Sequence, residues 1–169
     1  SNIITYNNLR LIFTFGGQYG GLIYSGAYNR DSWAGTLANT LPGRDEGVIV
    51  GDGVIQNDDG TYSPNTVPIS TQTYYGQYHQ IAEAGVFDSS FLKFREISLG
   101  FSFPKSLTNN LNIANLSLSV FGRNLAVFDD YPMFDPEAGT MNGTIFVPGL
   151  EMTPMPYTAS FGANLKIDF

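Results

Sequence analysis

The chain has 169 residues, which is enough for one domain with its own core. It contains no cysteine, so the sequence offers neither a disulfide framework nor a thiolate metal site. The formal net charge of -7 argues against nucleic-acid binding, which requires a basic patch. No apolar run is long enough for a transmembrane helix, and no signal peptide opens the chain, so we expect any export signal to lie outside this sequence.

Four segments alternate apolar and polar residues with a period of two, which is typical of strands with one face of each kind. We expect these strands near residues 6–16, 91–104, 114–128 and 157–169. The alternation slips near Arg95, where we expect a β-bulge or the start of a solvated extension of the strand.

The connections between these strands are long, short and long. The long connections, 17–90 and 129–156, carry thirteen of the fifteen acidic residues, and the short one is 105–113. The first long connection has room for hairpins, with a turn at "DDG" (58–60), and only "HQIAEAGVF" could form a helical turn or two. Transmembrane β-barrels have short periplasmic turns and long outer loops. The sequence therefore predicts an all-β fold, an antiparallel transmembrane β-barrel segment with extracellular loops at 17–90 and 129–156 and a periplasmic turn at 105–113.

A soluble β-sandwich or jelly roll would also hide one face of each strand. The polar faces here consist mainly of Ser, Gly, Asn and Thr, whereas Lys, Glu and Arg usually keep a solvated sheet soluble. The apolar faces carry no charge, and a Lys or Arg facing lipid at mid-depth costs about 2–4 kcal/mol. Both observations favour the barrel.

Several stretches resemble the C-terminal end of the SusC/RagA-like family, which are TonB-dependent transporters of the outer membrane in Bacteroidetes-type bacteria. The resemblance rests on "SSFLKFREISLGFSFPKSL" (89–107), "VFGRNLAVF" (120–128), "FDPEAGT" (134–140) and "YTASFGANLKIDF" (157–169). "YNNLRLIFTFGGQYGGLIYSG", near the start, resembles the preceding strand of that family.

The resemblance implies a 22-stranded barrel that contains an N-terminal plug, is closed by a SusD-like surface lipoprotein and is energised through TonB. Four strands cannot close such a barrel, so we expect this chain to be the last four strands of a much longer transporter. The plug and the TonB-contacting segment would belong to the missing N-terminal region. The partners implied are therefore the remainder of the transporter, the lipoprotein, TonB and membrane lipid, with no nucleic acid.

The terminal strand is the first candidate site. An alternating strand that ends in an aromatic residue resembles the signal by which outer-membrane barrels are assembled, and pairing of the last strand with the first removes both sheet edges. On this interpretation the lipid-facing residues are Phe161, Ala163, Leu165, Ile167 and Phe169, with Phe169 near the periplasmic aromatic girdle.

Charged residues on the polar faces form the second candidate site. Glu96 and Arg123 lie on neighbouring predicted strands and could face the lumen, where they would pair or contact the plug. Arg95 is a third candidate, although the phase slip leaves its direction open. The alternative is ordinary lumenal polarity without specificity. We expect the "FDPEAG" motif to order the loop before the last strand.

Aromatic residues in the first long connection form the third candidate site. Those we single out are Trp33, Tyr74, Tyr75 and Tyr78. They could stack on sugar rings, contact the lipoprotein or hold the long loop together. Self-packing and partner contact are the favoured interpretations.

The sequence gives little support to catalysis or metal binding. His79 is the single histidine and has no triad or ligand pattern around it. Asp58–Asp59 and Asp129–Asp130 fit turns better than calcium loops. We expect no enzyme activity and no cofactor.

The favoured function is part of an outer-membrane active importer for glycans or peptides. The alternatives are a soluble carbohydrate-binding β-sandwich and an outer-membrane enzyme or adhesin barrel.

Overall fold

The computed structural model describes residues 1–109, 113–137, 139–142 and 144–169. The chain forms two compact units. We call them the sheet unit (Ser1–Gly21, Asp88–Glu137 and Met155–Phe169) and the loop unit (Leu22–Phe87 and Ala138–Pro154).

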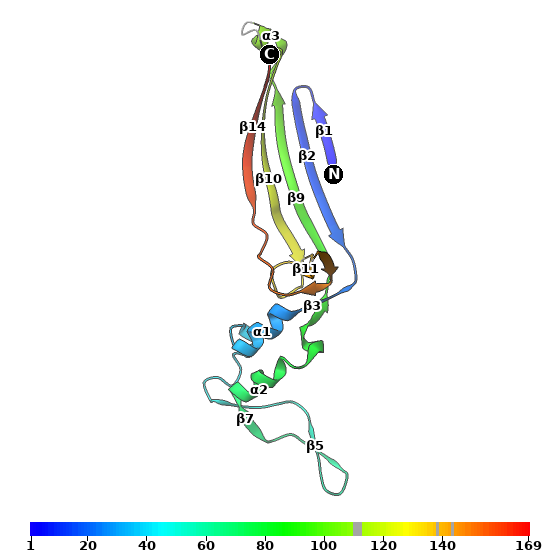
Figure 1. The fold of residues 1–169 in the computed structure, drawn as a ribbon, viewed down its shortest axis with the longest axis vertical. Helices are drawn as coiled ribbons and strands as arrows, with labels where there is room; N and C mark the ends of the chain where they lie inside the picture. The colour runs from blue at the N-terminus through cyan, green and yellow to red at the C-terminus, as the bar shows by residue number, and fades with distance from the viewer. Residues whose placement is uncertain (110–112, 138, 143) are drawn as a thin grey trace. The chain divides into compact units, whose positions relative to one another are not determined.

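The sheet unit is built on one antiparallel sheet of five strands, in the order β1-β2-β9-β10-β14 (Figure 1). The strands are β1 (Asn2–Tyr6), β2 (Leu9–Gln18), β9 (Phe91–Ser102), β10 (Asn115–Asp129) and β14 (Ser160–Asp168). A short helix, α3 (Lys105–Thr108), follows β9 after Pro104. The antiparallel, strand-rich architecture confirms the predicted all-β class.

The first strand region differs from the sequence prediction of one strand near 6–16. β1 and β2 are separate strands joined by a turn, in which Asn7 has a φ of 51°. This left-handed backbone reverses the chain, and asparagine tolerates it better than most residues do. The sheet therefore has a fifth strand that the alternation pattern missed, because "NIITY" is too short to show a clear period.

The register gives the sheet two chemically distinct faces. Residues paired across neighbouring strands form rows, and one such row is entirely apolar: Ile4, Leu11, Leu99, Val120 and Ala163. The large side chains of this face stay exposed, for example Leu165 at 62% and Phe161 at 76%. A row on the opposite face is polar: Thr14, Glu96, Arg123 and Ser160.

A β-bulge at Arg95 confirms the first of the two interpretations of the phase slip. Thr14 pairs with Glu96 and Phe15 pairs with Phe94, so Arg95 is the extra residue of β9. The bulge shifts the alternation of β9 by one residue. Phe94 consequently stacks on Phe15, with ring centroids 4.8 Å apart.

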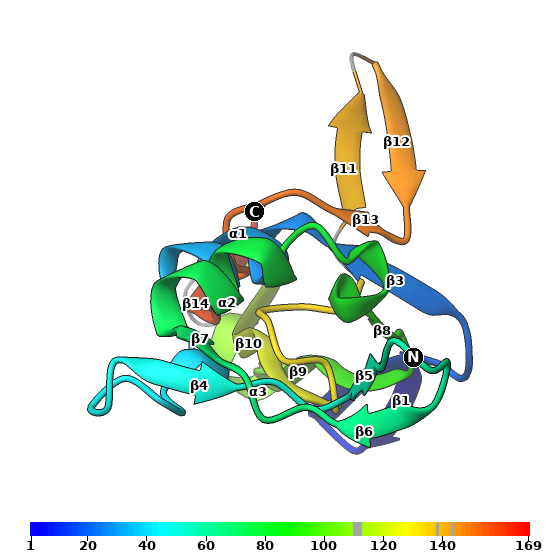
Figure 2. The ribbon, with the colours of Figure 1, turned by 90° about the horizontal axis from the view of Figure 1, so that it is seen from below.

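The loop unit contains the remaining elements, all of them short. Its strands are β3 (Leu22–Ser25), β4 (Val48–Val50), β5 (Val54–Gln56), β6 (Tyr62–Pro64), β7 (Pro68–Ser70), β8 (Val86–Asp88, which runs into the sheet unit), β11 (Gly139–Asn142), β12 (Ile145–Pro148) and β13 (Leu150–Glu151). Its helical elements are α1 (Gly26–Ala34), α2 (Thr71–Tyr78) and two 3-10 turns, η1 (Ala38–Thr40) and η2 (Ala82–Gly85). Helices α1 and α2 lie beside each other, and the β11–β12 hairpin extends away from them (Figure 2).

The two helices of the loop unit were not predicted from the sequence. Neither has an amphipathic pattern, because both are short and contain many polar residues. Each begins instead at a serine N-cap: Ser25 Oγ accepts a hydrogen bond from Tyr28 N, and Ser70 Oγ accepts one from Thr73 N. No helix in the described part of the chain is long and apolar enough to cross a membrane.

The turn predicted at 58–60 is confirmed. It closes the β5–β6 hairpin, where Asn57 N donates to Thr61 O and Gly60 has a φ of 81°. The Asp59 carboxylate accepts hydrogen bonds from Thr61 N and Thr61 Oγ1. These bonds hold the pKa of Asp59 below its ordinary value, the one from the Thr61 hydroxyl having the largest effect.

Candidate functional site

Four charged side chains meet on the polar face of the sheet unit. Lys93 Nζ lies 2.7 Å from Asp135 Oδ2 and 2.7 Å from Glu137 Oε2, and Arg95 Nη2 lies 2.7 Å from Glu137 Oε1. We call Lys93, Arg95, Asp135 and Glu137 the four-charge cluster. It joins strand β9 to the loop that follows β10.

The bulge brings both basic residues of the cluster to the polar face. Ile97 lies on the apolar face, and strict alternation would place Arg95 and Lys93 there as well. The extra residue at Arg95 resets the alternation, so that Lys93 and Arg95 reach the same carboxylate, Glu137. The bulge therefore keeps two charges off the apolar face.

The cluster is the most buried charged region among the described residues of the sheet unit. Lys93 is 9% exposed and Asp135 is 7% exposed. The Lys93 ammonium also lies 5.2 Å from the ring centroid of Phe91 and 5.4 Å from that of Tyr157. Two carboxylates and two rings thus replace the water around this ammonium, which is the arrangement that a buried cation requires.

The cluster also changes the acidity of Glu137. The hydrogen bond from Arg95 is the largest cause that holds the pKa of the Glu137 carboxyl below its ordinary value. Partial burial opposes this effect, and Lys93 adds to the lowering through its own hydrogen bond and its charge. The carboxyl is therefore a stable anion at neutral pH.

Asp135 and Glu137 of the "FDPEAG" motif bind within their loop and to strand β9, whereas Ala138 of the motif lies outside the described residues. Asp135 Oδ1 accepts a hydrogen bond from Glu137 N at 2.8 Å, which forms a local turn, while Asp135 Oδ2 binds Lys93. Asp129 Oδ1 accepts one from Tyr131 N at 2.9 Å earlier in the loop. The sequence did not identify Lys93 as the partner of the motif, because the two are 42 residues apart and no local pattern connects them.

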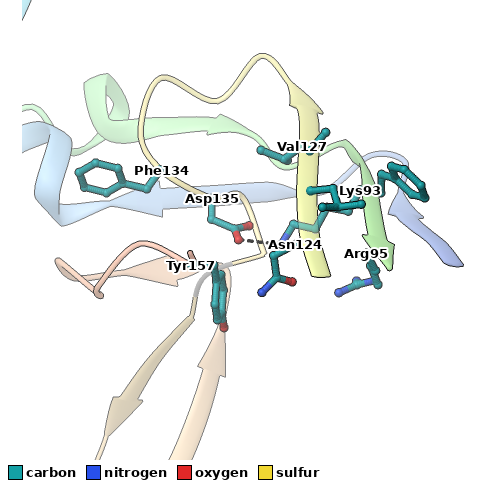
Figure 3. A pocket seen from close by; sticks show the side chains of 10 residues that line it. Lys93, Arg95, Asn124, Val127, Phe134, Asp135 and Tyr157 are labelled. Atoms are coloured by element: carbon teal, nitrogen blue, oxygen red, sulfur yellow. Dashed lines mark hydrogen bonds and ion pairs between the residues drawn. The ribbon is translucent and has the colours of Figure 1, made fainter. Parts of the chain in front are cut away.

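A hollow of about 190 Å³ lies beside the cluster, between the bulged strands and the loop (Figure 3). Phe134 and Tyr157 provide apolar surface to it, and Asn124 and Arg95 provide polar groups. Asn124 occupies the bulge of β10 opposite Arg95, with a φ of 52°. The hollow is smaller than the 300–1,000 Å³ typical of small-molecule sites.

The candidate residues Arg95, Glu96 and Arg123 do not form one site. Glu96 pairs with Arg123 directly across β9 and β10, with Oε1 and Nε 3.6 Å apart. Arg123 also lies over the ring of Phe121, 4.8 Å from its centroid. Arg95 belongs to the four-charge cluster instead.

The candidate residues of the terminal strand share one exposed face. Phe161, Ala163, Leu165 and Ile167 alternate along β14 and pair with Gly122, Val120, Leu118 and Leu116 of β10, respectively. Phe169 follows the end of β14 and is 92% exposed. This row continues the apolar face of the sheet.

The candidate aromatics of the loop unit largely pack on one another. Tyr74 contacts Tyr75 edge-on and stacks on Tyr78, with centroids 5.1 Å and 6.5 Å away. Tyr75 is buried, and burial is the largest cause that raises the pKa of its hydroxyl. Trp33 differs, because it is 57% exposed and has a tilted contact with His79 at 6.1 Å.

Comparison with known proteins gives two relatives by sequence. TonB-dependent receptor P39 of Formosa agariphila is 28% identical over 171 residues, which cover 100% of this chain and 16% of the receptor. TonB-dependent receptor P3 of the same organism is 35% identical over 63 residues, which cover 37% of this chain and 6% of the receptor. The chain thus spans a small part of the length of these receptors. No family model matches it.

Solved structures show the same fold. The RagAB peptide importer in its closed-closed state matches with a TM-score of 0.65 and 20% identity, over 98% of this chain and 16% of the other. The RagAB peptide transporter matches with a TM-score of 0.59 and 19% identity, over 96% and 16%. These relatives and structures are receptors and importers, and none of them points to an enzyme.

The described part of the sheet unit is one antiparallel sheet with an exposed apolar face, and long connections follow its strands. This is the arrangement expected of a segment of a membrane-barrel wall. The sequence relatives show which kind of membrane protein this chain resembles. The chain is similar in sequence to part of these TonB-dependent receptors, and it has the fold of the matching part of the RagAB importer.

Proposed function

We propose that the chain supplies wall strands and outer loops to an outer-membrane active importer for glycans or peptides. The observation that carries this proposal is the two-faced sheet: its apolar side chains remain exposed along β14 and the neighbouring strands, whereas its charged side chains lie on the other face. A lipid bilayer on one side and an aqueous lumen on the other would satisfy both faces.

The orientation and the roles of the residues follow from this placement. Phe161, Ala163, Leu165, Ile167 and Phe169 face lipid. The Glu96–Arg123 pair and Arg95 face the lumen. The connections 17–90 and 129–156 are outer loops, the turn at 105–113 is periplasmic, and residues 110–112 of that turn lie outside the described residues.

The partners of such an importer are a SusD-like surface lipoprotein, the plug and remaining barrel of the same transporter, and TonB. The support for the lipoprotein is the fold shared with the RagAB importer, and the support for TonB is the similarity to TonB-dependent receptors. The loop aromatics Trp33, Tyr74 and Tyr78 would lie on the outer side, within reach of lipoprotein or substrate.

The soluble β-sandwich remains the competing reading, and the sheet unit argues against it. A sandwich covers the apolar face of one sheet with a second sheet. Among the described residues, the sheet unit contains one sheet only, and its apolar face is exposed.

The proposal is tested by purifying the complete transporter through an affinity tag after detergent extraction of outer membranes. We expect barrel and plug peptides together with a surface lipoprotein in the purified complex, and loss of uptake when TonB is deleted. A species that contains this chain, remains in the soluble fraction and folds without detergent would contradict the proposal.

A further inference from the structure

The loop unit contains an open hollow that the packing of its aromatic residues does not fill. It has a volume of about 480 Å³, within the range of small-molecule sites. It lies where α1 ends and α2 begins, and its lining includes Trp33, Gly35, Thr40, Arg44, Gln72 and Tyr75.

Trp33 gives the hollow an available aromatic surface. Trp33 is the only tryptophan in the sequence and is 57% exposed, whereas Tyr75, which also lines the hollow, is 8% exposed. An indole carries a large, rigid apolar face that gains free energy when it is covered. Among the described residues of the loop unit, the ring of Trp33 contacts only that of His79, so much of the indole surface remains uncovered.

Arg44 gives the hollow a fixed hydrogen-bond donor. Its Nε donates to Thr40 O at 2.9 Å, and its Nη2 donates to Thr40 Oγ1 at 2.6 Å and to Gly35 O. These acceptors are neutral, and no carboxylate of the described chain lies within 4.0 Å of the guanidinium. Arg44 Nη1 has no acceptor among the described residues, so its two N–H groups remain available in a position that the other hydrogen bonds fix.

The charge of the loop unit selects against an anionic ligand. By sequence the unit has eight acidic residues and two arginines, Arg30 and Arg44. This surplus creates a negative potential that repels anions. The ligand chemistry that fits is neutral, with a flat apolar face for Trp33 and oxygen acceptors for Arg44 and Gln72.

We propose that this hollow is a subsite for a neutral oligosaccharide, in which the CH face of a pyranose ring stacks on Trp33 and ring hydroxyls bond to Arg44 and Gln72. The inference rests on the proposed importer function, since it names the substrate class for an outer loop of that importer. Trp33 is a binding residue, and Arg44 both binds the sugar and fixes the wall of the hollow.

The test uses the complete detergent-solubilised transporter on two printed arrays, one of neutral oligosaccharides and one of peptides. Trp33→Ala should weaken binding of the retained oligosaccharides at least about tenfold, and Trp33→Phe should weaken it less because a smaller ring remains. Tyr62→Ala is the matched control, because Tyr62 is 65% exposed in the β5–β6 hairpin and does not line the hollow. Its binding should equal that of the unmodified transporter.

A second readout locates the sugar. In transporter labelled with 5-fluorotryptophan, the fluorine resonance that Trp33→Phe removes should shift when the array-selected oligosaccharide is added. The inference is overturned if no neutral oligosaccharide binds, if Trp33→Ala binds sugar as well as Tyr62→Ala does, or if the variant loses peptides instead. The importer function would still stand in those cases, provided that the variants remain in the outer membrane with their lipoprotein.

Discussion

The four-charge cluster predicts that the loop after β10 is held by a buried ion pair. In Lys93→Met the side chain keeps most of its length but loses the charge that lies 2.7 Å from both Asp135 and Glu137. Glu137 keeps Arg95 as a partner, whereas Asp135, with a side chain only 9% exposed, is left as a buried anion without a cation. Removing one partner of a buried pair costs about 3–5 kcal/mol, and the remaining Arg95–Glu137 pair favours the lower limit.

The assay is hydrogen exchange of the backbone amides of residues 131–137 in the complete transporter. A cost of about 3 kcal/mol accelerates exchange roughly 100-fold, since each 1.4 kcal/mol is a factor of ten. Lys166→Met is the matched control, because its pair with Asp168 is 3.4 Å long and its side chain is 73% exposed. Such a surface pair contributes about 0–1 kcal/mol.

A double variant separates the ion pair from general packing loss. Lys93→Met with Asp135→Asn removes the unpaired charge and retains the side-chain oxygen that accepts from Glu137 N. Its loop should exchange more slowly than that of Lys93→Met alone. The reasoning is refuted if Lys93→Met and Lys166→Met accelerate exchange to the same extent, or if the double variant is worse than the single one.

Three further predictions concern acidity, capping and the apolar face. The folded-state pKa of Glu137 is below its ordinary value of 4.5, so the contribution of Glu137 to stability is present above pH 4.5 and is lost as pH falls through the lowered value. Amide exchange in the loop, corrected for intrinsic rates, should therefore rise in acid. Glu137→Gln should reduce that rise. Ser25→Ala removes an N-cap and a hydrogen bond to the buried Glu151 carboxylate, so it should destabilise α1 by about 2 kcal/mol. Ser70→Ala removes only an exposed cap, so it should destabilise α2 by about 1 kcal/mol. Amide exchange in each helix measures both effects. Leu165→Arg should cost about 2–4 kcal/mol on a lipid-facing strand and reduce the amount of folded transporter in the outer membrane, whereas Asn164→Arg, on the other face, should be tolerated. Gel mobility before and after heating measures the folded amount of both variants. Equal amounts would count against a lipid-facing position for Leu165.

Local patterns were sufficient to predict much of the sheet unit. The alternation in β9, β10 and β14 reflects an environment that differs between the two faces, and a period of two records this directly. The bulge at Arg95 was also visible in the sequence, because Lys93 and Ile97 are four residues apart and regular alternation would place both on the apolar face. The turn at 58–60 was visible because Asp and Gly there meet a local backbone requirement.

The remaining features depend on residues that are distant in the sequence or on weak local signals. Lys93 and Asp135 meet only when the loop after β10 folds over the bulge, and neither residue announces its partner. Helices α1 and α2 are stabilised by caps and by mutual packing rather than by an apolar stripe. The hollow at Trp33 is formed by segments near residues 33, 44 and 72, which only the folded loop unit brings together.

The measurement that tests the central claim most directly is site-directed spin labelling of β14 in the complete transporter in lipid vesicles. Single labels at positions 163, 164, 165 and 166 would be compared for collision with oxygen, which concentrates in lipid, and with a water-soluble nickel chelate. The account predicts strict alternation, with oxygen favoured at Ala163 and Leu165 and nickel favoured at Asn164 and Lys166. Equal access of the nickel chelate to all four positions would show that the apolar face does not contact lipid and would contradict the account.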